Sequence, residues 1–234
     1  RYRDAFGDLN HIYRLAESDT LLVTLNAQGV ILQSTIASEY LETQHLLNSL
    51  ERDYMSSPRL LFNHIPLYRK SSTSCGHVNP NYVISNRVGY SYRNLMPSLE
   101  TKTILDKIKP IAVVSGDSHQ QCWVEHTLEE KTIPEYTIGT ASFMQGQHWP
   151  SFGLLTLSGQ NHALNICYLT PQNYVFGWMA LIAFLLLIIG FSIQYRENYR
   201  LLVYRYCKKE ATISPNCQAI MKTIKWSLGT IGIA

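Results

Sequence analysis

An uncharged apolar segment in the last third of the sequence limits what this chain can fold into. Residues 174–193 read YVFGWMALIAFLLLIIGFSI and carry no charge over 20 positions. A helix that crosses about 30 Å of hydrocarbon needs roughly 20 residues at about 1.5 Å per residue. A helix of this length in a soluble domain would normally show a polar stripe, but no polar side chain occurs between Trp178 and Ser192. The segment is therefore predicted to be a transmembrane helix.

The basic residues on its two sides predict its orientation. No Lys or Arg occurs at residues 132–195, and five follow directly: Arg196, Arg200, Arg205, Lys208 and Lys209. Cytoplasmic flanks of membrane spans carry the excess of Lys and Arg. We therefore expect a non-cytoplasmic domain at residues 1–172, a transmembrane helix at 173–195 and a basic cytoplasmic tail at 196–234. Within that tail, residues 224–234 are a candidate start of a second membrane segment.

The order of elements in residues 1–172 predicts an α/β fold. Residues 20–34 are read as two strands around a turn at 26–29. Helices are expected at residues 38–54 and from Ser98, as N-cap, to the residue before Pro110. Further strands are expected at residues 59–64, 111–114, 122–126, 135–139, 152–157 and 163–169. This order suggests an α/β sandwich that is completed by a run of β structure.

Net charge and cysteine count give two further expectations. A formal net charge of +3 is too small to suggest nucleic acid as a partner. Three cysteines precede the apolar segment, and a non-cytoplasmic domain would permit one disulfide among them. We favour Cys75 with Cys122. The alternative is that these two and Cys167 are unpaired, half-buried thiols.

Two histidine-bearing loops each follow an apolar strand. The first is LFNHIPLYR at residues 61–69, and the second is VVSGDSHQQC at 113–122. Imidazole and carboxylate groups are good ligands for Mn, Fe or Zn. Two such metals about 3.5–4 Å apart can clamp a phosphate and activate a water molecule. One His after a strand is more often a hydrogen-bonded structural residue, but the two loops together, in this order, favour a metal site.

These two loops resemble the last two metal motifs of the calcineurin-like metallophosphoesterase superfamily. In that pattern a His precedes a Pro-containing loop, and a later Gly-His-x-His closes the site. Within the superfamily the chain is similar to membrane-bound enzymes that remove ethanolamine phosphate from glycosylphosphatidylinositol (GPI) anchors. That similarity rests on LYR at 67–69, the Cys-Gly at 75–76, Cys122, EYTIGTAS at 135–142 and PSFG at 150–153. RDAFGDLN at residues 3–10 resembles the segment after the family's Gly-Asn-His-Asp motif, so the resemblance runs from residue 1 to the membrane helix.

The resemblance implies the carboxy-terminal half of a metallophosphoesterase β-sandwich flanked by helices, with two divalent metal ions. The ions are expected to be Mn, with Fe or Zn as alternatives, and the implied ligands are His64, Asp117 and His119. Asp117 stands where the family has a His. An oxygen donor there either holds the second metal and favours a harder ion, or weakens the second site.

The sequence has no initiator Met or signal peptide, so we expect a fragment of a longer protein. The family's remaining ligands and its catalytic His would lie before Arg1. This fragment alone is therefore expected to be inactive.

The long polar loop after the first motif contains candidate substrate residues. His77 could approach the substrate phosphate, and Tyr82, Tyr90 and Tyr92 could line a sugar or headgroup site. The alternative is an exposed loop whose aromatic residues pack locally. His126 lies on a predicted strand and is expected to be structural.

The resemblance implies a phosphodiesterase that removes ethanolamine phosphate from GPI-anchor mannose, in the endoplasmic reticulum or Golgi membrane with a lumenal catalytic domain. Its partners would be the phosphorylated lipid or glycan headgroup and the membrane. One alternative is a phosphoesterase with another substrate. Another is a degenerate domain that serves as a binding module. The replacement of the family's His by Asp117 supports this second alternative.

Overall fold

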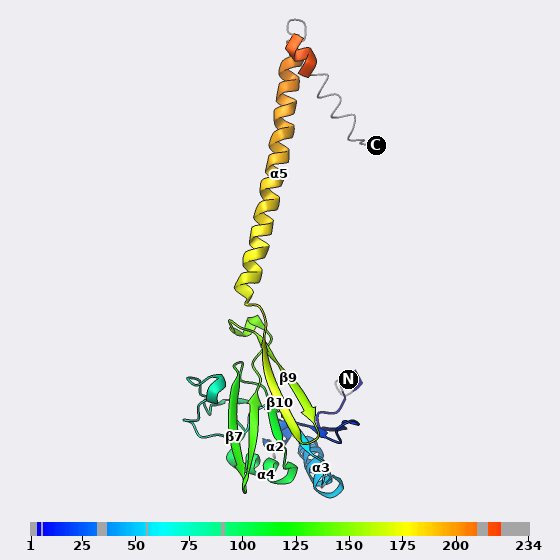
Figure 1. Cartoon of the computed structure of the whole chain (residues 1–234), viewed down its shortest axis with the longest axis vertical. Coiled ribbons are helices and arrows are strands. Elements are labelled where there is room, and N and C mark those ends of the chain that lie inside the picture. The colour runs from blue at the N-terminus through cyan, green and yellow to red at the C-terminus, as the bar shows by residue number, and fades with distance from the viewer. Residues whose placement is uncertain are drawn as a thin grey trace. The chain divides into compact units, whose positions relative to one another are not determined.

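The structure of this chain is a computed structural model, and it describes residues 4–5, 7–31, 37–54, 56–89, 92–209 and 215–220 (Figure 1). The chain divides into two units, Arg1–Gln172 and Asn173–Ala234. The first unit is a mixed α/β domain. The second contains most of a single long helix, α5 (Gln172–Lys209).

The centre of the first unit is a six-stranded sheet in the order β1-β2-β3-β6-β8-β7. The four inner strands β2, β3, β6 and β8 run parallel to one another, and β1 and β7 pair antiparallel at the two edges. Parallel strands end at the same edge of a sheet. The bounds are β1 (His11–Arg14), β2 (Leu21–Leu25), β3 (Arg59–Asn63), β6 (Ala112–Ser115), β7 (Cys122–Leu128) and β8 (Lys131–Thr137).

Two predicted helices are confirmed, as α3 (Ala37–Asp53) and α4 (Ser98–Ile108). The N-cap of α4 is Pro97 rather than Ser98, so the predicted start was wrong by one residue. Apolar side chains of these helices pack on one face of the sheet. Their shared core includes Leu47 and Leu50 of α3, Ile104 and Ile108 of α4, and Val23, Leu61, Val113 and Ile133 of the sheet.

The strand predicted after residue 29 is wrong. Residues Ala27–Ile31 form the short helix α2, which packs against α3. A Cβ atom on Gly29 would lie 2.6 Å from Thr43 Oγ1 and 3.1 Å from the carbonyl oxygen of Glu39. The absence of a side chain at Gly29 is therefore what allows α2 and α3 to approach so closely. This contact is tertiary, and the apolar pattern of residues 30–32 could not reveal it.

The hairpin of β9 (Ser151–Ser158) and β10 (Asn161–Tyr168) forms a separate two-stranded sheet (Figure 1). The hairpin packs against residues of β8 and the position after it that alternate with the buried side chains of that strand. Tyr136 lies edge to face with His162, with ring centroids 6.1 Å apart, and the Ile138 side chain would lie 3.0 Å from a Cβ on Gly153. Alternate residues of a strand point to opposite faces, so the hairpin covers the face of β8 opposite the helices. Further short elements in the described part of the domain are η1 (Gly76–Val78), β4 (Val88–Gly89), β5 (Tyr92–Arg93) and η2 (Phe143–Gln145).

Arg59 fixes the first residue of β3 against two helix ends. Its buried guanidinium donates to the carbonyl oxygens of Ile108 at 2.8 Å and Leu50 at 3.0 Å, and also to that of Tyr54. Carbonyl groups at the end of a helix have no partner within the helix. Arg59 therefore ties α3 and α4 to the strand whose other end carries the candidate site. Burial lowers the pKa of Arg59 from its ordinary value.

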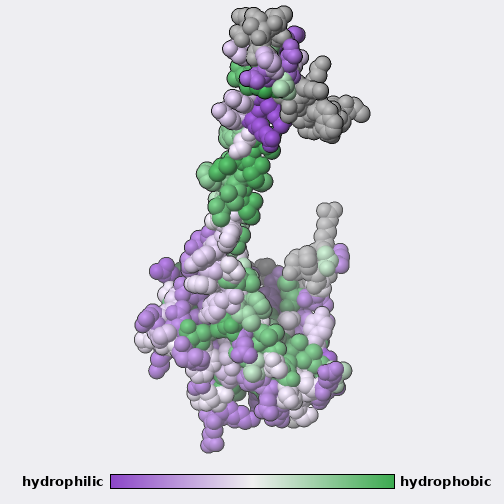
Figure 2. Space-filling model, turned by 45° about the horizontal axis from the view of Figure 1, so that its top comes forward, coloured by the Kyte–Doolittle hydropathy of each residue, from purple (hydrophilic) through white to green (hydrophobic). Residues whose placement is uncertain are grey.

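In the part of the chain that the structure describes, α5 is the one helix long and apolar enough to cross a membrane. None of the residues in its apolar stretch is buried, and Figure 2 shows a hydrophobic stretch along the helix followed by hydrophilic residues. The predicted segment 174–193 lies inside this helix, which continues to Lys209 through the basic residues. Length and composition thus agree with a membrane span.

Candidate metal and substrate site

His64 and Asp117 meet at the edge of the sheet where the parallel strands end. His64 directly follows β3, and Asp117 lies two residues after β6, the neighbouring strand. His64 Nε2 is 3.6 Å from Asp117 Oδ1. The backbone N–H of Gly116 donates to the carbonyl oxygen of His64 at 3.0 Å. The pairing of the two strands therefore continues into the loops and holds the imidazole beside the carboxylate.

Both side chains are accessible. His64 has 73% of its side chain exposed and Asp117 has 35%. The backbone of Asp117 is left-handed, with φ of 61°, a conformation that Asp tolerates better than most residues. The N–H of Ser118 donates to Gly116 O at 2.7 Å in the same tight turn. This turn places the carboxylate at the rim, where a ligand can reach it.

The donor set fits part of a divalent-metal site. One imidazole and one carboxylate at 3.6 Å are suitable ligands for Mn, Fe or Zn. A complete site takes about four to six donors. Among the residues that the structure describes, no three His, Cys, Asp or Glu gather closely enough to hold an ion. His119 is thus not brought together with the other two predicted ligands.

His119 lines a cavity of about 370 Å³ together with Asp117. Two polar contacts hold the long loop against this cavity: Tyr82 Oη lies 3.2 Å from Ser118 Oγ, and Asn79 Nδ2 donates to Gln120 Oε1 at 2.9 Å. The other side chains around it are mainly amide, hydroxyl and apolar. They are Tyr82, Ile84, Asn94, Ser118, Gln120 and Gln147. Tyr82 was a predicted lining residue. The amide side chains of the cavity were not predicted, because Asn and Gln in loops belong to no recognisable sequence motif.

His77 lies elsewhere on the domain. It is an exposed residue of η1, its ring centroid is 5.0 Å from that of Trp123, and it lines a different cavity of about 220 Å³. The structure therefore does not place His77 beside Asp117 and His119. Tyr90 and the side chain of Tyr92 are outside the described residues.

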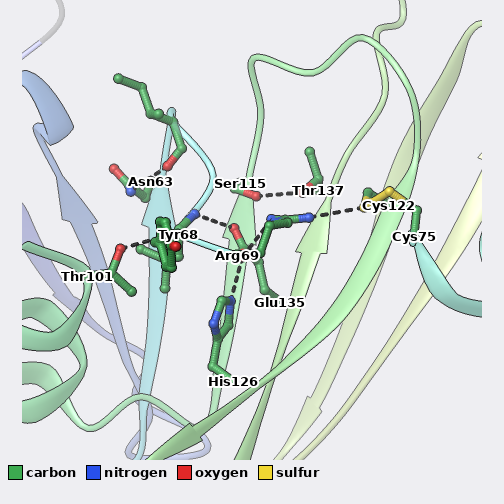
Figure 3. Close-up of polar contacts among 12 residues, drawn as sticks. Asn63, Tyr68, Arg69, Cys75, Thr101, Ser115, Cys122, His126, Glu135 and Thr137 are labelled. Atoms are coloured by element: carbon green, nitrogen blue, oxygen red, sulfur yellow. Dashed lines mark hydrogen bonds and ion pairs between the residues drawn. A yellow bond between two sulfur atoms is a disulfide. The ribbon is translucent and has the colours of Figure 1, made fainter. Parts of the chain in front are cut away.

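A buried charge network joins the loop after β3 to strands β7 and β8 (Figure 3). Glu135 of β8 is fully buried and accepts from Arg69 Nη2 at 2.8 Å and from His126 Nε2 at 2.7 Å. Its other oxygen accepts the backbone N–H of Leu67 at 2.9 Å. Glu135 therefore fixes the loop that begins with His64. His126 has a structural position, as expected from the sequence.

The charge of Glu135 depends on these partners. Burial raises the pKa of Glu135, but the hydrogen bonds from His126 and Leu67 and the charges of Arg69 and His126 together lower it by more. The pKa therefore lies below the ordinary carboxyl value, and Glu135 stays ionised at neutral pH. Sequence reasoning missed this network, because nothing in the strand KTIPEYT marks its one Glu as buried.

A disulfide joins Cys75 to Cys122, which confirms the pairing favoured from the sequence. Arg69 Nη1 lies 3.1 Å from the sulfur of Cys122. The disulfide, the buried ion pair and the loop after β3 thus form one connected unit (Figure 3). Cys167 is free and half-buried.

The mixed α/β fold with a parallel-rich sheet, and with His and Asp at neighbouring strand ends, fits a metallophosphoesterase. The chain is similar to the metallophosphoesterase 1 homologue of Caenorhabditis elegans, with 26% identity over 72% of this chain and 49% of the relative. The Drosophila melanogaster homologue is 27% identical over 61% of this chain and 37% of the relative. The cell division control protein 1 of Saccharomyces cerevisiae is 28% identical over 43% of this chain and 22% of the relative.

This chain spans less than half the length of these curated relatives. No family model matches the sequence. A crystal structure of a Thermus thermophilus protein gives a TM-score of 0.35 at 13% identity, over 67% of this chain and 56% of that one, and this likeness carries no weight. The relatives named metallophosphoesterase support the superfamily predicted from the two loops, a hydrolase of phosphoesters and, in general, divalent metal ions.

Proposed function

We propose that this chain is part of a membrane-anchored, metal-dependent phosphodiesterase. The observation that carries the proposal is the His64–Asp117 pair, which lies 3.6 Å apart at neighbouring strand ends beside a cavity of about 370 Å³. The metallophosphoesterase relatives support the same chemistry. A degenerate binding module would share the fold but would not turn over substrate.

His64 and Asp117 would hold one edge of the metal centre, and His119 would act from the cavity wall. When bound, two divalent ions would polarise the phosphoester and make water a better nucleophile. Mn fits the carboxylate donor best, with Fe or Zn as alternatives. The remaining ligands and the catalytic His would come from residues outside this chain. Residues 1–234 alone should therefore show no turnover.

The cavity lining suits a polar headgroup. Asn94, Gln120 and Gln147 offer amide N–H donors and carbonyl acceptors around Asp117 and His119. Such groups can orient a phosphate and neighbouring hydroxyl groups by hydrogen bonds. With the sequence resemblance, this favours ethanolamine phosphate on the mannose of a GPI anchor as the substrate. Another phosphorylated lipid or glycan headgroup is the alternative.

The test of the catalytic proposal is mutation of the two His residues in the full-length protein. We expect His64→Ala and His119→Ala each to lower phosphodiester turnover at least about 1,000-fold, which corresponds to about 4 kcal/mol of transition-state stabilisation. The matched control is His45→Ala, because His45 is an exposed His on α3. Wild-type turnover in both site variants would contradict the assignment. A wild-type protein without turnover that still binds a phosphorylated headgroup would identify a binding module.

The membrane proposal places α5 across the endoplasmic reticulum or Golgi membrane with the first unit in the lumen. Its support is the apolar, exposed surface of α5 and the basic residues that follow position 195. A tag after Arg205 should be digested by protease added to sealed microsomes, while residues 1–172 of the full-length protein should be protected. Protection of the tag would show that the proposed orientation is wrong.

A further inference from the structure

The segment between β8 and β9 is among those parts of the first unit that expose large apolar side chains. Residues 143–149, here called the η2 loop, include Phe143 at 48% exposure, Met144 at 82% and Trp149 at 53%. The loop lies within the stretch 132–195 that contains no Lys or Arg. Clustered apolar exposure of this kind usually marks a surface that contacts a partner or a membrane.

Backbone hydrogen bonds connect the residues that flank this loop to His119 and to Leu169, three positions before α5 begins. Thr140 N–H donates to His119 O at 3.1 Å, and Ser151 N–H donates to Thr140 O at 2.9 Å. Leu169 N–H donates to Pro150 O at 2.7 Å. The η2 loop therefore starts and ends at the edge of the domain that carries His119, beside the strand that leads to α5.

Chain length limits how far this edge can be from the membrane. Gln172, where α5 begins, is three positions after Leu169, and these three steps span at most about 11 Å. The polar headgroup layer on each side of the hydrocarbon is roughly 5–8 Å thick. If α5 crosses the bilayer, Pro150 and its neighbours lie within reach of that layer.

We propose that the η2 loop inserts into the interfacial layer of the membrane that α5 crosses. Trp and other amphipathic or apolar side chains favour this layer, and the covalent link to α5 makes this bilayer the nearest surface. Gln147 of the same loop lines the cavity with Asp117 and His119. Insertion would thus open the cavity at the level of lipid headgroups. The proposal rests on the proposed membrane anchor and deepens the proposed function: the substrate is a phosphoester presented at the membrane surface.

The test is tryptophan fluorescence of the full-length protein in phosphatidylcholine nanodiscs whose acyl chains carry bromine near the headgroup. Bromine quenches only tryptophans within short range. We compare the wild type with three single substitutions: Trp149→Phe in the η2 loop, Trp178→Phe in α5 and Trp123→Phe in β7. The fluorescence intensity lost to bromine quenching should fall in the first two variants and stay unchanged in the third. Loss of quenching with Trp178→Phe but not with Trp149→Phe would overturn the loop proposal and leave the anchor intact. An unchanged quenched intensity in all three variants would contradict the membrane anchor, and the loop proposal with it.

A kinetic comparison tests the consequence for substrate access. Met144→Gln should lower kcat/KM at least about threefold for a phosphodiester embedded in vesicles, and leave kcat/KM for a soluble phosphodiester unchanged. The control is Leu99→Gln, because Leu99 is 73% exposed on α4 and should affect neither substrate. Equal losses on both substrates with Met144→Gln would show that the loop acts on the site and not through the membrane, and would contradict the proposal. An unchanged rate on the embedded substrate would do so too.

Discussion

The loop after β3 has two halves of opposite character. Its first residue, His64, is mostly exposed and lies 3.6 Å from a carboxylate that is itself accessible. Its last part, Leu67 to Arg69, is buried and holds Glu135 by three contacts together with His126. Ionisable groups that are satisfied inside a protein stabilise its fold, whereas groups with accessible donor atoms can bind a ligand. This difference indicates that the buried half of the loop stabilises the fold, whereas the exposed half can bind a ligand.

The largest expected effect on stability comes from breaking the buried half. Glu135→Gln removes the charge that neutralises Arg69, and an uncompensated buried charge costs about 3–5 kcal/mol. The free energy of unfolding should fall by about that amount in chemical denaturation. The control is Glu125→Gln, because Glu125 is exposed on β7, the strand that pairs with β8.

Substitution in the exposed half should change the free energy of unfolding much less, in the same denaturation experiment. His64→Ala should change the free energy of unfolding by less than about 0.5 kcal/mol, as is usual for exposed side chains. A larger loss with His64→Ala than with Glu135→Gln would break the division of the loop into a structural and a functional half.

A smaller effect should appear on acidification. The pKa of Glu135 is lower in the folded protein than in the unfolded chain, because His126 and Arg69 stabilise its charged form. Its contribution to stability is therefore complete above the ordinary carboxyl pKa of about 4.3 and is lost as the pH falls through the folded value. The stability difference between wild type and Glu135→Gln should narrow from pH 5 to pH 3. A difference that widens over this range would mean that the pKa is raised instead.

Much of the fold was predictable from local pattern. The helices α3 and α4 have apolar residues at helical spacing, and the strands β3 and β6 are short apolar runs that end in polar loops. The helix α2 was not predictable, because its conformation depends on the close contact of Gly29 with Thr43 and Glu39. That contact joins residues 10 to 14 positions apart, beyond the reach of local propensity.

The candidate site was also predictable only in part, because some of its residues are placed by local strand ends and others by long-range contacts. His64 and Asp117 follow strands that lie side by side in a parallel sheet, so their loops meet at one edge. The amide side chains of the cavity and the position of His77 depend on how the long loop packs. The burial of Glu135 depends on Arg69, which lies 66 positions away. Sequence pattern does not encode such long-range partners.

The central claim is that the exposed pair holds metal, and metal content measured by mass spectrometry tests it most directly. In the full-length protein, Asp117→Ala should lower the number of bound divalent ions per chain, together with phosphodiester turnover, while the Glu125→Gln control keeps both. Asp117→His should restore the ions and shift the preference towards softer metals if Asp117 is a ligand of an intact site. An increase from about one ion to two with Asp117→His would instead mean that the carboxylate weakens the second site. An unchanged metal content and turnover in both Asp117 variants would contradict the claim.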